Sequence, residues 1–530
     1  MPNLKGVGSL FSDFGGYTSS HGIPQVASAK NACIRAFWIV VVVGTLLVFS
    51  VQFGMMVVKY YEYPVTISTS LRFEELTFPM VTVCNGNAYK YSKLKVHAPK
   101  MFRLMREYSS LLTKGKLIDP ADEFGYKRMN TKFERQALAN RAIVLLANEL
   151  SESSMEAITY SYEELIKQCS FKGVPCVKSD FKKIVHPSNG ACYQYNWEDN
   201  STRTVMRSGV SEGLKMELMI VQEDPPGDFL PTMETAAASV AVTPQRHEHF
   251  MNSFGLPIAV GYLSLIGLRM SRSYRMEPPY GQAVETLDRS RYFYEAPYSM
   301  EGWFRSCAQR RIVRSCRCAD PRYAKPHNDT SWCTIEKLHC ILDVQMNTGK
   351  DNDTDCDCPP PLYEEFFNPT VTQSVYPAEK FNVPGACTRA RELLDQGFYG
   401  RGARQKCLRY YRKNSLLLQM YYERLNVNNL KEQASYTSTD LIADFGGQLG
   451  LWVGTSVISM VEFLGLLLMI VLFCTARGSG APPQATPPPS RPRSSAHSDS
   501  HSDNKSGSSD SEQDDDDEEV TRNSPPNKNV

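Results

Sequence analysis

The sequence lacks the short motifs that mark the common enzyme classes. It contains no glycine-rich phosphate loop, no Ser/His/Asp nucleophile pattern and no His/Glu metalloprotease motif. It also lacks an excess of either charge, since 58 Lys and Arg face 57 Asp and Glu. The basic stretch 401–412 therefore reads as a solvated helix face, with a nucleic-acid patch as the alternative. We expect a protein that is not an enzyme, needs no cofactor or resident metal, and binds no nucleic acid.

A cleavable signal peptide is missing as well. A mostly polar segment, residues 1–35, precedes the first apolar run, and no small-residue cleavage site follows that run at the usual distance. We expect the run to stay in the mature protein as a membrane anchor.

Two long apolar runs, Ala36–Val58 and Phe445–Ala476, are each long enough to cross a bilayer as a helix. Two crossings place both termini on one side of the membrane, and the flanking Lys30, Arg35 and Arg477 place that side in the cytosol. The expected division at the plasma membrane is a cytosolic N-terminus 1–35, a first span 36–58, an extracellular domain 59–443, a second span with the pore 444–476, and a disordered cytosolic tail 477–530. The tail is rich in Pro and Ser and includes an acidic run, 514–519, so it cannot bury a core.

The second run carries polar residues that a plain anchor does not need. Glu462 costs several kcal/mol if it faces lipid, so it should face protein or water. Gly454, beside Thr455 and Ser456, offers a place where a helix can open and present carbonyls and hydroxyls to a cation. The alternative is tight helix packing through small residues. We expect a helix that lines a pore.

Cysteines gather between the two runs. Of the 15 cysteines only Cys33 and Cys474 lie elsewhere, at the cytosolic membrane edges, where free thiols are expected. Residues 307–358 hold seven cysteines, which is typical of a module stapled by disulfides, although Cys and the nearby His339 could instead bind zinc. Three sequons in the same region, at Asn200, Asn328 and Asn352, are candidate glycosylation sites.

The outer region mixes strand and helix signals. Val81, Thr82 and Val83 predict a strand that begins after a proline, and strand signals return within 191–243 and 416–425. Apolar residues at three- and four-residue spacing predict helices within 99–167, and 387–412 is also helix-like. A helical insertion on a β core is the simplest interpretation.

Four pieces of the chain, in order, resemble the degenerin/epithelial sodium channel/acid-sensing ion channel family. They are His21-Gly22, Phe78-Pro-Met-Val-Thr-Val-Cys84-Asn, Gly190-Ala-Cys192-Tyr-Gln-Tyr-Asn and Gly446-Gly-Gln-Leu-Gly-Leu-Trp-Val-Gly454-Thr-Ser456. The resemblance covers roughly residues 20–476. It implies an α+β membrane protein with two transmembrane helices and a large disulfide-rich extracellular domain, built from a β palm, a β ball and a helical finger, thumb and knuckle. Three such subunits, identical or related, would surround a sodium-selective pore.

The resemblance also implies roles for single residues. Gly454, Thr455 and Ser456 match the selectivity constriction and Gly450 matches the site of amiloride block, while Asp444 and Glu462 would place negative charge at the two ends of the pore. The remaining matches concern gating and are His21, Gly22, Ala443, Leu425 and Asn426.

Disulfide pairing follows from the same resemblance. The implied pairs are Cys84–Cys192, Cys169–Cys176, Cys307–Cys356, Cys316–Cys340 and Cys318–Cys333. Cys387 and Cys407 are additional cysteines outside this set, and we expect them to form a sixth pair. The chain departs from acid-sensing relatives at Ala283 and Leu362, which stand where a thumb bridge would form, and at Trp303, which leaves Cys358 without its usual partner.

A second departure concerns the stimulus. Acid-sensing members carry a histidine pair just outside the first span, where this chain has Tyr63 and Pro64. We therefore expect an amiloride-sensitive sodium channel that is opened by an extracellular neuropeptide of the FMRFamide type, with gating motions coupled to the spans through Tyr60–Tyr63 and Tyr280. The alternatives are a proton-gated, mechanically gated or constitutive channel of the same family, and a two-span cell-surface receptor that does not conduct. A trimeric ATP-gated receptor also has two spans, but it would need clustered basic residues to bind phosphate. That class of receptor also lacks the Gly454-Thr-Ser456 signature that this chain has.

Overall fold

The computed structural model describes residues 4–478, except for 199–202, 223–227, 285–289, 348–355, 382, 384–386, 388–392 and 394–396. The chain divides into two compact units, which we describe in turn. The larger unit comprises residues 31–455, and the smaller one comprises residues 1–30 together with 456–530.

The larger unit begins with helix α3 (Ala32–Tyr61), whose residues are mostly apolar. It extends four residues before and three residues beyond the predicted span 36–58, because the flanking sequence contains no residue that ends a helix before Glu62. Within the described residues, α3 is the one helix that is long and apolar enough to cross a membrane by itself. A second crossing arises only if the two helical segments of the C-terminal apolar run belong to one broken span.

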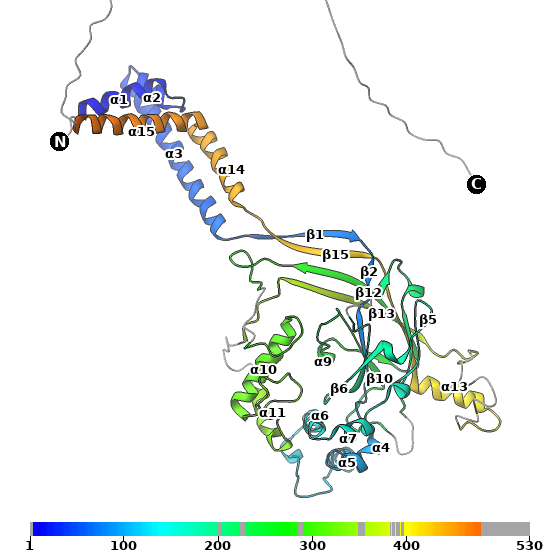
Figure 1. Cartoon of the computed structure of the whole chain (residues 1–530). Coiled ribbons are helices and arrows are strands. Elements are labelled where there is room, and N and C mark those ends of the chain that lie inside the picture. Colours follow the sequence, from blue (N-terminus) through cyan, green and yellow to red (C-terminus); the bar gives the residue numbers. More distant parts are fainter. Residues whose placement is uncertain are drawn as a thin grey trace, which may run out of the picture. The chain divides into compact units, whose positions relative to one another are not determined.

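Two β-sheets form the centre of the larger unit (Figure 1). The first has the strand order β1-β15-β12-β14-β9-β4-β5, and β13 also pairs with β12. Its strands are β1 (Val65–Phe73), β4 (Ile166–Phe171), β5 (Val174–Pro175), β9 (Leu214–Met219), β12 (Tyr262–Tyr274), β13 (Tyr363–Val375), β14 (Ser415–Tyr422) and β15 (Asn426–Ala434). The second sheet has the order β11-β10-β3-β7-β6, formed by β3 (Met80–Asn85), β6 (Phe181–His186), β7 (Gly190–Tyr195), β10 (Ala237–Thr243) and β11 (Leu256–Ala259). A small ladder joins β2 (Leu76–Thr77) to β8 (Thr204–Val205).

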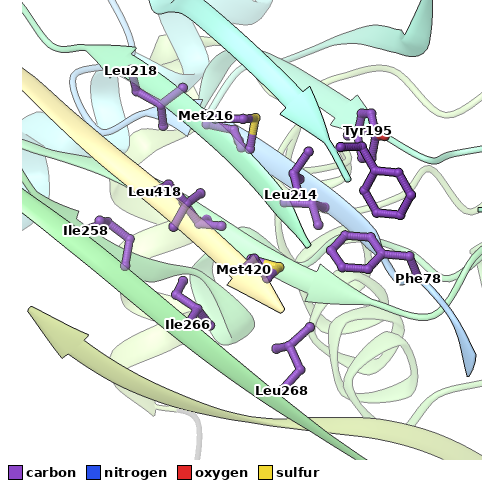
Figure 2. Close-up of a cluster of buried hydrophobic side chains, with 14 of the residues drawn as sticks. Phe78, Tyr195, Leu214, Met216, Leu218, Ile258, Ile266, Leu268, Leu418 and Met420 are labelled. Atoms are coloured by element: carbon purple, nitrogen blue, oxygen red, sulfur yellow. The ribbon is translucent and has the colours of Figure 1, made fainter. Parts of the chain in front are cut away.

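The main core contains side chains from both sheets (Figure 2). Phe78 and Tyr195 meet Leu214 and Met216 of β9, while Ile266 of β12 and Leu418 of β14 extend the same cluster. Strands β3 and β7 are buried at every position, which explains why the sequence of β3 contains no charged residue and does not alternate between apolar and exposed polar positions. Each such fully buried aliphatic side chain contributes about 1.5–3 kcal/mol of hydrophobic stabilisation.

Helices form a second core of their own, in the region predicted as a helical insertion. They are α4 (Tyr91–His97), α5 (Pro99–Lys114), α6 (Lys132–Asn148), α7 (Glu152–Ile158) and α8 (Tyr162–Leu165). The buried faces of α5 and α6 bring together Leu104, Tyr108, Leu138 and Leu145. Helix α6 starts at a capping box in which Thr131 and Glu134 satisfy each other's backbone N–H groups. The predicted insertion of helices on a β core is confirmed.

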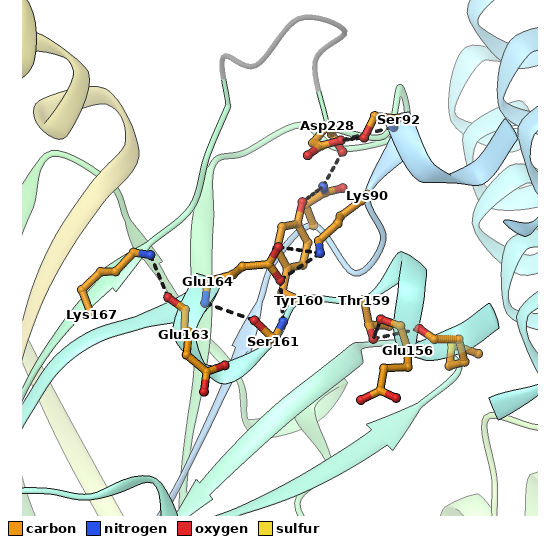
Figure 3. Close-up of polar contacts among 12 residues, drawn as sticks. Lys90, Ser92, Glu156, Thr159, Tyr160, Ser161, Glu163, Glu164, Lys167 and Asp228 are labelled. Atoms are coloured by element: carbon orange, nitrogen blue, oxygen red, sulfur yellow. Dashed lines mark hydrogen bonds and ion pairs between the residues drawn. The ribbon is translucent and has the colours of Figure 1, made fainter. Parts of the chain in front are cut away.

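Polar contacts fasten this helical region to the sheets (Figure 3). Ser161 and Glu164 form a capping box at the start of α8, and the Glu164 carboxylate also accepts from the Lys90 Nζ at 2.7 Å. Nearby, the Asp228 carboxylate accepts from the Ser92 hydroxyl. The Lys90–Glu164 contact joins the segment after β3 to the helix that leads into β4, and the Ser92–Asp228 bond joins α4 to the segment between β9 and β10.

The remaining helices of the outer domain lie near disulfides. They are α9 (Met251–Phe254), α10 (Met300–Cys316), α11 (Leu338–Asn347) and α13 (Ala403–Asn414). Six disulfide bonds are present in the described part of the chain. Five join the pairs that the resemblance implies, Cys84–Cys192, Cys169–Cys176, Cys307–Cys356, Cys316–Cys340 and Cys318–Cys333, and the sixth joins the additional cysteines Cys387 and Cys407. Among the described side chains, Cys33 and Cys358 are free thiols, whereas the side chain of Cys474 lies outside the described part. Six of the seven cysteines of the segment 307–358 are therefore paired in three disulfides, as predicted.

Surface position can be checked for one of the three sequons. Asn328 is exposed, while Asn200 and Asn352 lie outside the described residues, as does the acidic run 514–519 of the tail. The predicted helix-like stretch 387–412 is shorter in the described part, where α13 begins at Ala403 after Gly402, whose φ is +82°.

The smaller unit consists of α1 (Leu4–Tyr17), α2 (Ile23–Ser28) and α15 (Val457–Gly478). Helix α1 packs closely against α2 at Gly15, where a Cβ would lie 3.3 Å from the Cβ of Ala27. The Phe14 ring lies 5.1 Å from the Phe463 ring of α15. The two ends of the chain's described part thus pack together.

Candidate functional site

The C-terminal apolar run is interrupted where the sequence predicts it. Helix α14 (Ser438–Gln448) continues as a π-helical turn, Leu449–Val453, and residues 454–456 are not helical. Gly454 ends the turn with a left-handed φ of +62°, a conformation that costs other residues about 1–2 kcal/mol. Its N–H donates to the Gly450 carbonyl at 3.1 Å. The break therefore follows from a glycine at one defined position.

The residues after Gly454 present polar groups. The hydroxyl of Thr455 is buried without a hydrogen-bond partner among the described residues, while Ser456 is exposed. The Ser456 N–H donates to the Ser459 hydroxyl at 3.2 Å, which satisfies one of the free N–H groups at the start of α15. An interrupted helix that exposes carbonyl, hydroxyl and N–H groups can coordinate an ion.

Helix α14 and the π-helical turn pack against α3 through contacts that sequence reasoning missed. The Trp452 indole donates to the Gln52 side-chain oxygen at 2.7 Å and lies 2.9 Å from that of Gln448. Phe445 contacts the rings of Phe49 and Phe53 at 5.9 and 5.3 Å. The available signal was Gln52 itself, because an amide within an apolar run usually finds a partner on another helix.

In the smaller unit, Glu462 accepts hydrogen bonds from the segment between α1 and α2. The Ser19 backbone N–H and the Thr18 hydroxyl donate to the Glu462 carboxylate at 2.8 and 3.0 Å, and the Ser19 hydroxyl donates at 3.2 Å. The Ser19 hydroxyl also bonds the hydroxyl of the fully buried Ser459. The expectation that this acid faces protein or water, rather than lipid, is met by three donors on one carboxylate.

The predicted gating residues His21 and Gly22 come directly after Thr18 and Ser19, which donate to the Glu462 carboxylate and which we call the Thr18–Ser19 clamp. His21 is exposed, and Gly22 is buried with a φ of +85° as it caps the start of α2. Its carbonyl accepts from the Val26 N–H at 3.1 Å. A residue with a Cβ would strain this backbone, so the structure gives a local reason for the glycine.

Tyrosines link the outer domain to both helices of the larger unit. Tyr63, which has a φ of +47°, lies 5.2 Å from the ring of Tyr280 and also contacts Tyr60 and Tyr61. The Tyr280 hydroxyl donates to the Tyr436 carbonyl at 3.4 Å. The structure thus brings the Tyr60–Tyr63 cluster and Tyr280 together, whereas the sequence predicted only that both couple gating motions to the spans.

The other predicted site residues lie along the same helix and strands. Ala443 and Gly450 are exposed, and the carboxylate of the exposed Asp444 accepts from the Tyr436 hydroxyl at 2.8 Å. Leu425 ends the turn before β15, and Asn426 is the first residue of β15, opposite Phe73 of β1. Strand β1 follows α3, and β15 leads into α14, so this strand pair adjoins both helices (Figure 1).

Two arginines at the C-terminal end of β12, which were not predicted from the sequence as site residues, form ion pairs at the first sheet. Arg272 binds the carboxylates of both Glu365 and Glu74, which raises its pKa, and Arg275 binds Glu364 at 2.9 Å. These carboxylates are therefore neutralised by ion pairs.

Buried histidines in the outer domain have low pKa values. Burial lowers the pKa of His186 and that of His249 to about 4, so both are neutral at physiological pH. Burial acts in the opposite direction on two carboxyl groups and raises the pKa of Glu217 and that of Glu248.

Comparison with known proteins supplies the family. The sequence profile of the family described as "Amiloride-sensitive sodium channel" matches residues 14–466. "Degenerin-like protein asic-2" of Caenorhabditis elegans is 33% identical over 490 residues, which cover 90% of this chain and 89% of that protein. "Degenerin unc-8" and "Degenerin mec-10" of the same organism are 30% and 28% identical, and the matches cover 43% and 48% of their lengths. A solved proton-activated chloride channel aligns with 82% of this chain at a TM-score of 0.31 and 7% identity, a likeness too small to bear on fold or function.

The extent of the profile match, which includes the His21-Gly22 pair and the break at residues 454–456, settles the class of the protein. The chain belongs to the amiloride-sensitive sodium channel family, with the degenerins among its relatives, and is a membrane sodium-channel subunit and not an enzyme.

Proposed function

We propose that three copies of this subunit, or this subunit with two relatives, form an amiloride-sensitive sodium channel opened by an extracellular neuropeptide of the FMRFamide type. Both termini lie in the cytosol in this arrangement. The observation that carries the pore assignment is the break at residues 454–456, with its left-handed glycine and exposed polar groups.

The pore is formed where three copies of the break meet. Carbonyl and hydroxyl groups of Gly454, Thr455 and Ser456 replace part of the hydration shell of sodium. Asp444 and Glu462 contribute one negative charge per subunit near the two ends of the pathway, which attracts cations and repels anions. Amiloride binds at Gly450, one helical turn before the constriction.

Gating follows the chain connections. Ligand binding in the outer domain favours one arrangement of the strand pair β1–β15, and the Tyr63–Tyr280–Tyr436 contacts pass that change to α3 and α14. Gly22 and the adjoining Thr18–Ser19 clamp on Glu462 control the inner part of the pathway.

A neuropeptide is favoured over protons by the state of the titratable groups. His186 and His249 do not take up protons near neutral pH, and Arg272 already neutralises two carboxylates of the first sheet. A cavity of about 370 Å³ between β10, α9 and β13 offers a site for an aromatic, cationic peptide, because it is lined by Phe250, Phe254, Phe366 and the carboxyl group of Glu248.

The test is expression in oocytes under voltage clamp. Peptides that end in Arg-Phe-amide are expected to evoke an inward sodium current that amiloride blocks, and Glu248→Gln is expected to shift the half-maximal peptide concentration upward about fivefold. Glu234→Gln serves as the control, since Glu234 does not line this cavity. A chain that reaches the surface and passes no sodium current with any peptide would contradict the proposal.

Proton gating is the second candidate, and one observation favours it. Burial raises the pKa values of Glu217 and Glu248, so these carboxyl groups take up protons at a higher pH than exposed ones do. A pH step without peptide separates the candidates, because an acid-evoked current that Glu217→Gln and Glu248→Gln remove would replace the peptide assignment.

A further inference from the structure

The outer domain contains a second cavity, of about 460 Å³, with a positively charged lining. It lies between helix α6, the end of β3 and the turn between β6 and β7. Arg141 of α6 and Arg322 both line it, and its described lining includes no Asp or Glu. Neither the pore nor the proposed peptide cavity shares these residues.

The charge next to this cavity is not balanced. The carboxylate of Asp320, whose side chain is completely buried, accepts from the Nε and Nη2 atoms of Arg322. The Nη1 atom of Arg141 lies 3.6 Å from the same carboxylate, and the Arg141 side chain is only 16% exposed. Two guanidinium groups thus share one carboxylate, which leaves one positive charge largely shielded from water. Burial, together with the neighbouring Arg322, lowers the pKa of Arg141 to about 10, so the charge persists at neutral pH.

Asp320 cannot move to improve this balance. Its backbone N–H donates to the Gln309 side chain at 2.9 Å, and its carbonyl accepts from the same side chain at 3.1 Å. The Cys318–Cys333 disulfide closes the loop that carries it. The arginine pair is therefore held by a rigid support.

Four polar atoms that line the cavity lack a hydrogen-bond partner among the described residues. They are Arg141 Nη1, Asn85 Nδ2, Ser188 Oγ and Thr232 Oγ1. Asn85 and Thr232 are each 3% exposed, so both are almost completely removed from bulk solvent. The two nitrogens can only donate, and the two hydroxyls can also donate. An acceptor that carries negative charge satisfies all four.

We propose that this cavity binds a small monovalent anion, which neutralises the excess charge of Arg141 and Arg322 and joins the helical insertion to the disulfide-closed loop 318–333. The cavity is about fifteen times the volume that one water molecule occupies in the liquid, so the anion enters with part of its hydration shell. Chloride is the simplest such anion, and a carboxylate has the same charge and acceptor chemistry.

The test is the thermal unfolding of the purified full-length chain in detergent, which does not depend on conduction. Chloride replaces methanesulfonate, a weakly binding anion without a carboxylate, at constant ionic strength, with acetate in a parallel arm to represent carboxylates. Binding to the folded state alone is expected to raise the unfolding midpoint by about 2–3 °C in a saturable way. A shift with chloride or with acetate supports the proposal and identifies the class of anion, whereas equal midpoints in all three salts overturn it.

Three variants locate the effect. Arg141→Gln is expected to remove the anion-dependent shift, and Thr232→Val, which keeps the shape but loses the unpaired hydroxyl, is expected to reduce it by at least half. Arg103→Gln is the matched control, because Arg103 lies on α5 of the same helical region in an exposed ion pair with Glu123. An unchanged shift in Arg141→Gln, or in Thr232→Val if Arg141→Gln does not fold, would place the anion elsewhere and overturn the assignment. Failure here would leave the sodium-channel proposal untouched.

Discussion

The outer domain and the apolar helices of this subunit are held together by different means. The outer domain has six disulfides and two large apolar cores, whereas α3 and α14 meet through ring contacts of Phe445 and the hydrogen bond from Trp452 to Gln52. A densely linked region resists change and a sparsely linked one can adopt two arrangements at small cost. Substitutions in the outer domain should therefore affect folding, and substitutions in the helices should affect conduction.

The largest expected effect concerns the Cys84–Cys192 disulfide. It closes a loop of 108 residues between two completely buried strands, whereas Cys169–Cys176 spans only 7. In the chain-entropy description, loss of the first bond costs about 5 kcal/mol and loss of the second about 2.5 kcal/mol. Replacing both cysteines of each pair by serine is therefore expected to abolish surface expression for Cys84–Cys192 and to lower it for Cys169–Cys176.

Surface biotinylation measures this difference. Normal surface expression of the Cys84/Cys192 variant combined with altered ion selectivity would contradict the statement that substitutions in the outer domain affect folding and not conduction.

The next effect is a loss of stability in acid that arises in the outer domain. His186 and His249 have folded-state pKa values near 4, below the ordinary value of 6.5. The unfolded chain takes up these protons first, so the stabilisation is complete above about pH 6.5 and is lost as the pH falls toward 4, by about 3 kcal/mol for each histidine. Glu217 and Glu248 act in the opposite direction, because their raised pKa values favour proton uptake by the folded state.

A variant with His186→Asn and His249→Gln isolates the histidine part. Unfolding midpoints measured from pH 7 to pH 4 are expected to fall less steeply in this variant than in the wild type. Parallel slopes would show that the histidines are not protonated on unfolding in this range.

A pair of glycines sharpens the comparison within the helices themselves. Gly454 has a left-handed backbone, whereas Gly44 lies inside the continuous helix α3 with no atom within 4 Å of its Cβ position. Gly454→Ala costs about 1–2 kcal/mol at the break, and we expect it to lower the sodium-to-potassium permeability ratio about tenfold. Gly44→Ala should leave the ratio unchanged, because alanine favours a helix. Reversal potentials in mixed sodium and potassium solutions give the permeability ratio of each variant. Equal ratios in the two variants would show that the break is not part of the selectivity site.

This contrast also shows what the sequence can and cannot predict. The break is predictable because Gly454 and the two hydroxyl residues after it are adjacent in the chain, and the strands around Val81–Val83 are predictable because β-branched runs suit a buried sheet. Five of the six disulfide pairs came from the family resemblance, and Cys387–Cys407 was expected because these two cysteines remained outside that set. The π-helical turn before Gly454 was not predicted, since no local pattern distinguishes it from an α-helix.

Contacts between distant segments account for the rest. The partners of Glu462 lie 443 and 444 residues away, Trp452 and Gln52 are 400 residues apart, and the Arg272–Glu74 pair spans 198 residues. Composition and periodicity carry no information about such pairs, which depend on how the chain returns to itself. The sequence indicated that Glu462 needs a polar environment but not which residues supply it.

A smaller effect is expected at that carboxylate. Glu462→Gln keeps the shape but replaces charge-assisted hydrogen bonds from Thr18 and Ser19 with weaker neutral ones. We expect the maximal sodium current to fall about fivefold at unchanged surface expression, and Asp13→Asn, an exposed position on α1, to leave it unaltered. A current equal to that of the wild type would show that the clamp does not serve conduction.

The smallest effect tests whether the sparse contact between α3 and α14 contributes to gating. Cross-helix hydrogen bonds in membranes average about 0.6 kcal/mol in double-mutant cycles, which corresponds to about a threefold change in an equilibrium or a rate. Gln52→Leu and Trp452→Phe each remove the Trp452–Gln52 bond, so either change alone should alter the closing rate about threefold and the double variant should add little more. Trp452 retains Gln448 as a second acceptor, which makes Gln52→Leu the milder of the two changes. The double-mutant cycle is completed by measuring closing rates after ligand removal in the wild type, the two single variants and the double variant. Strictly additive effects would mean that the two side chains act independently, and the helices would then be coupled through the Phe445 ring contacts instead.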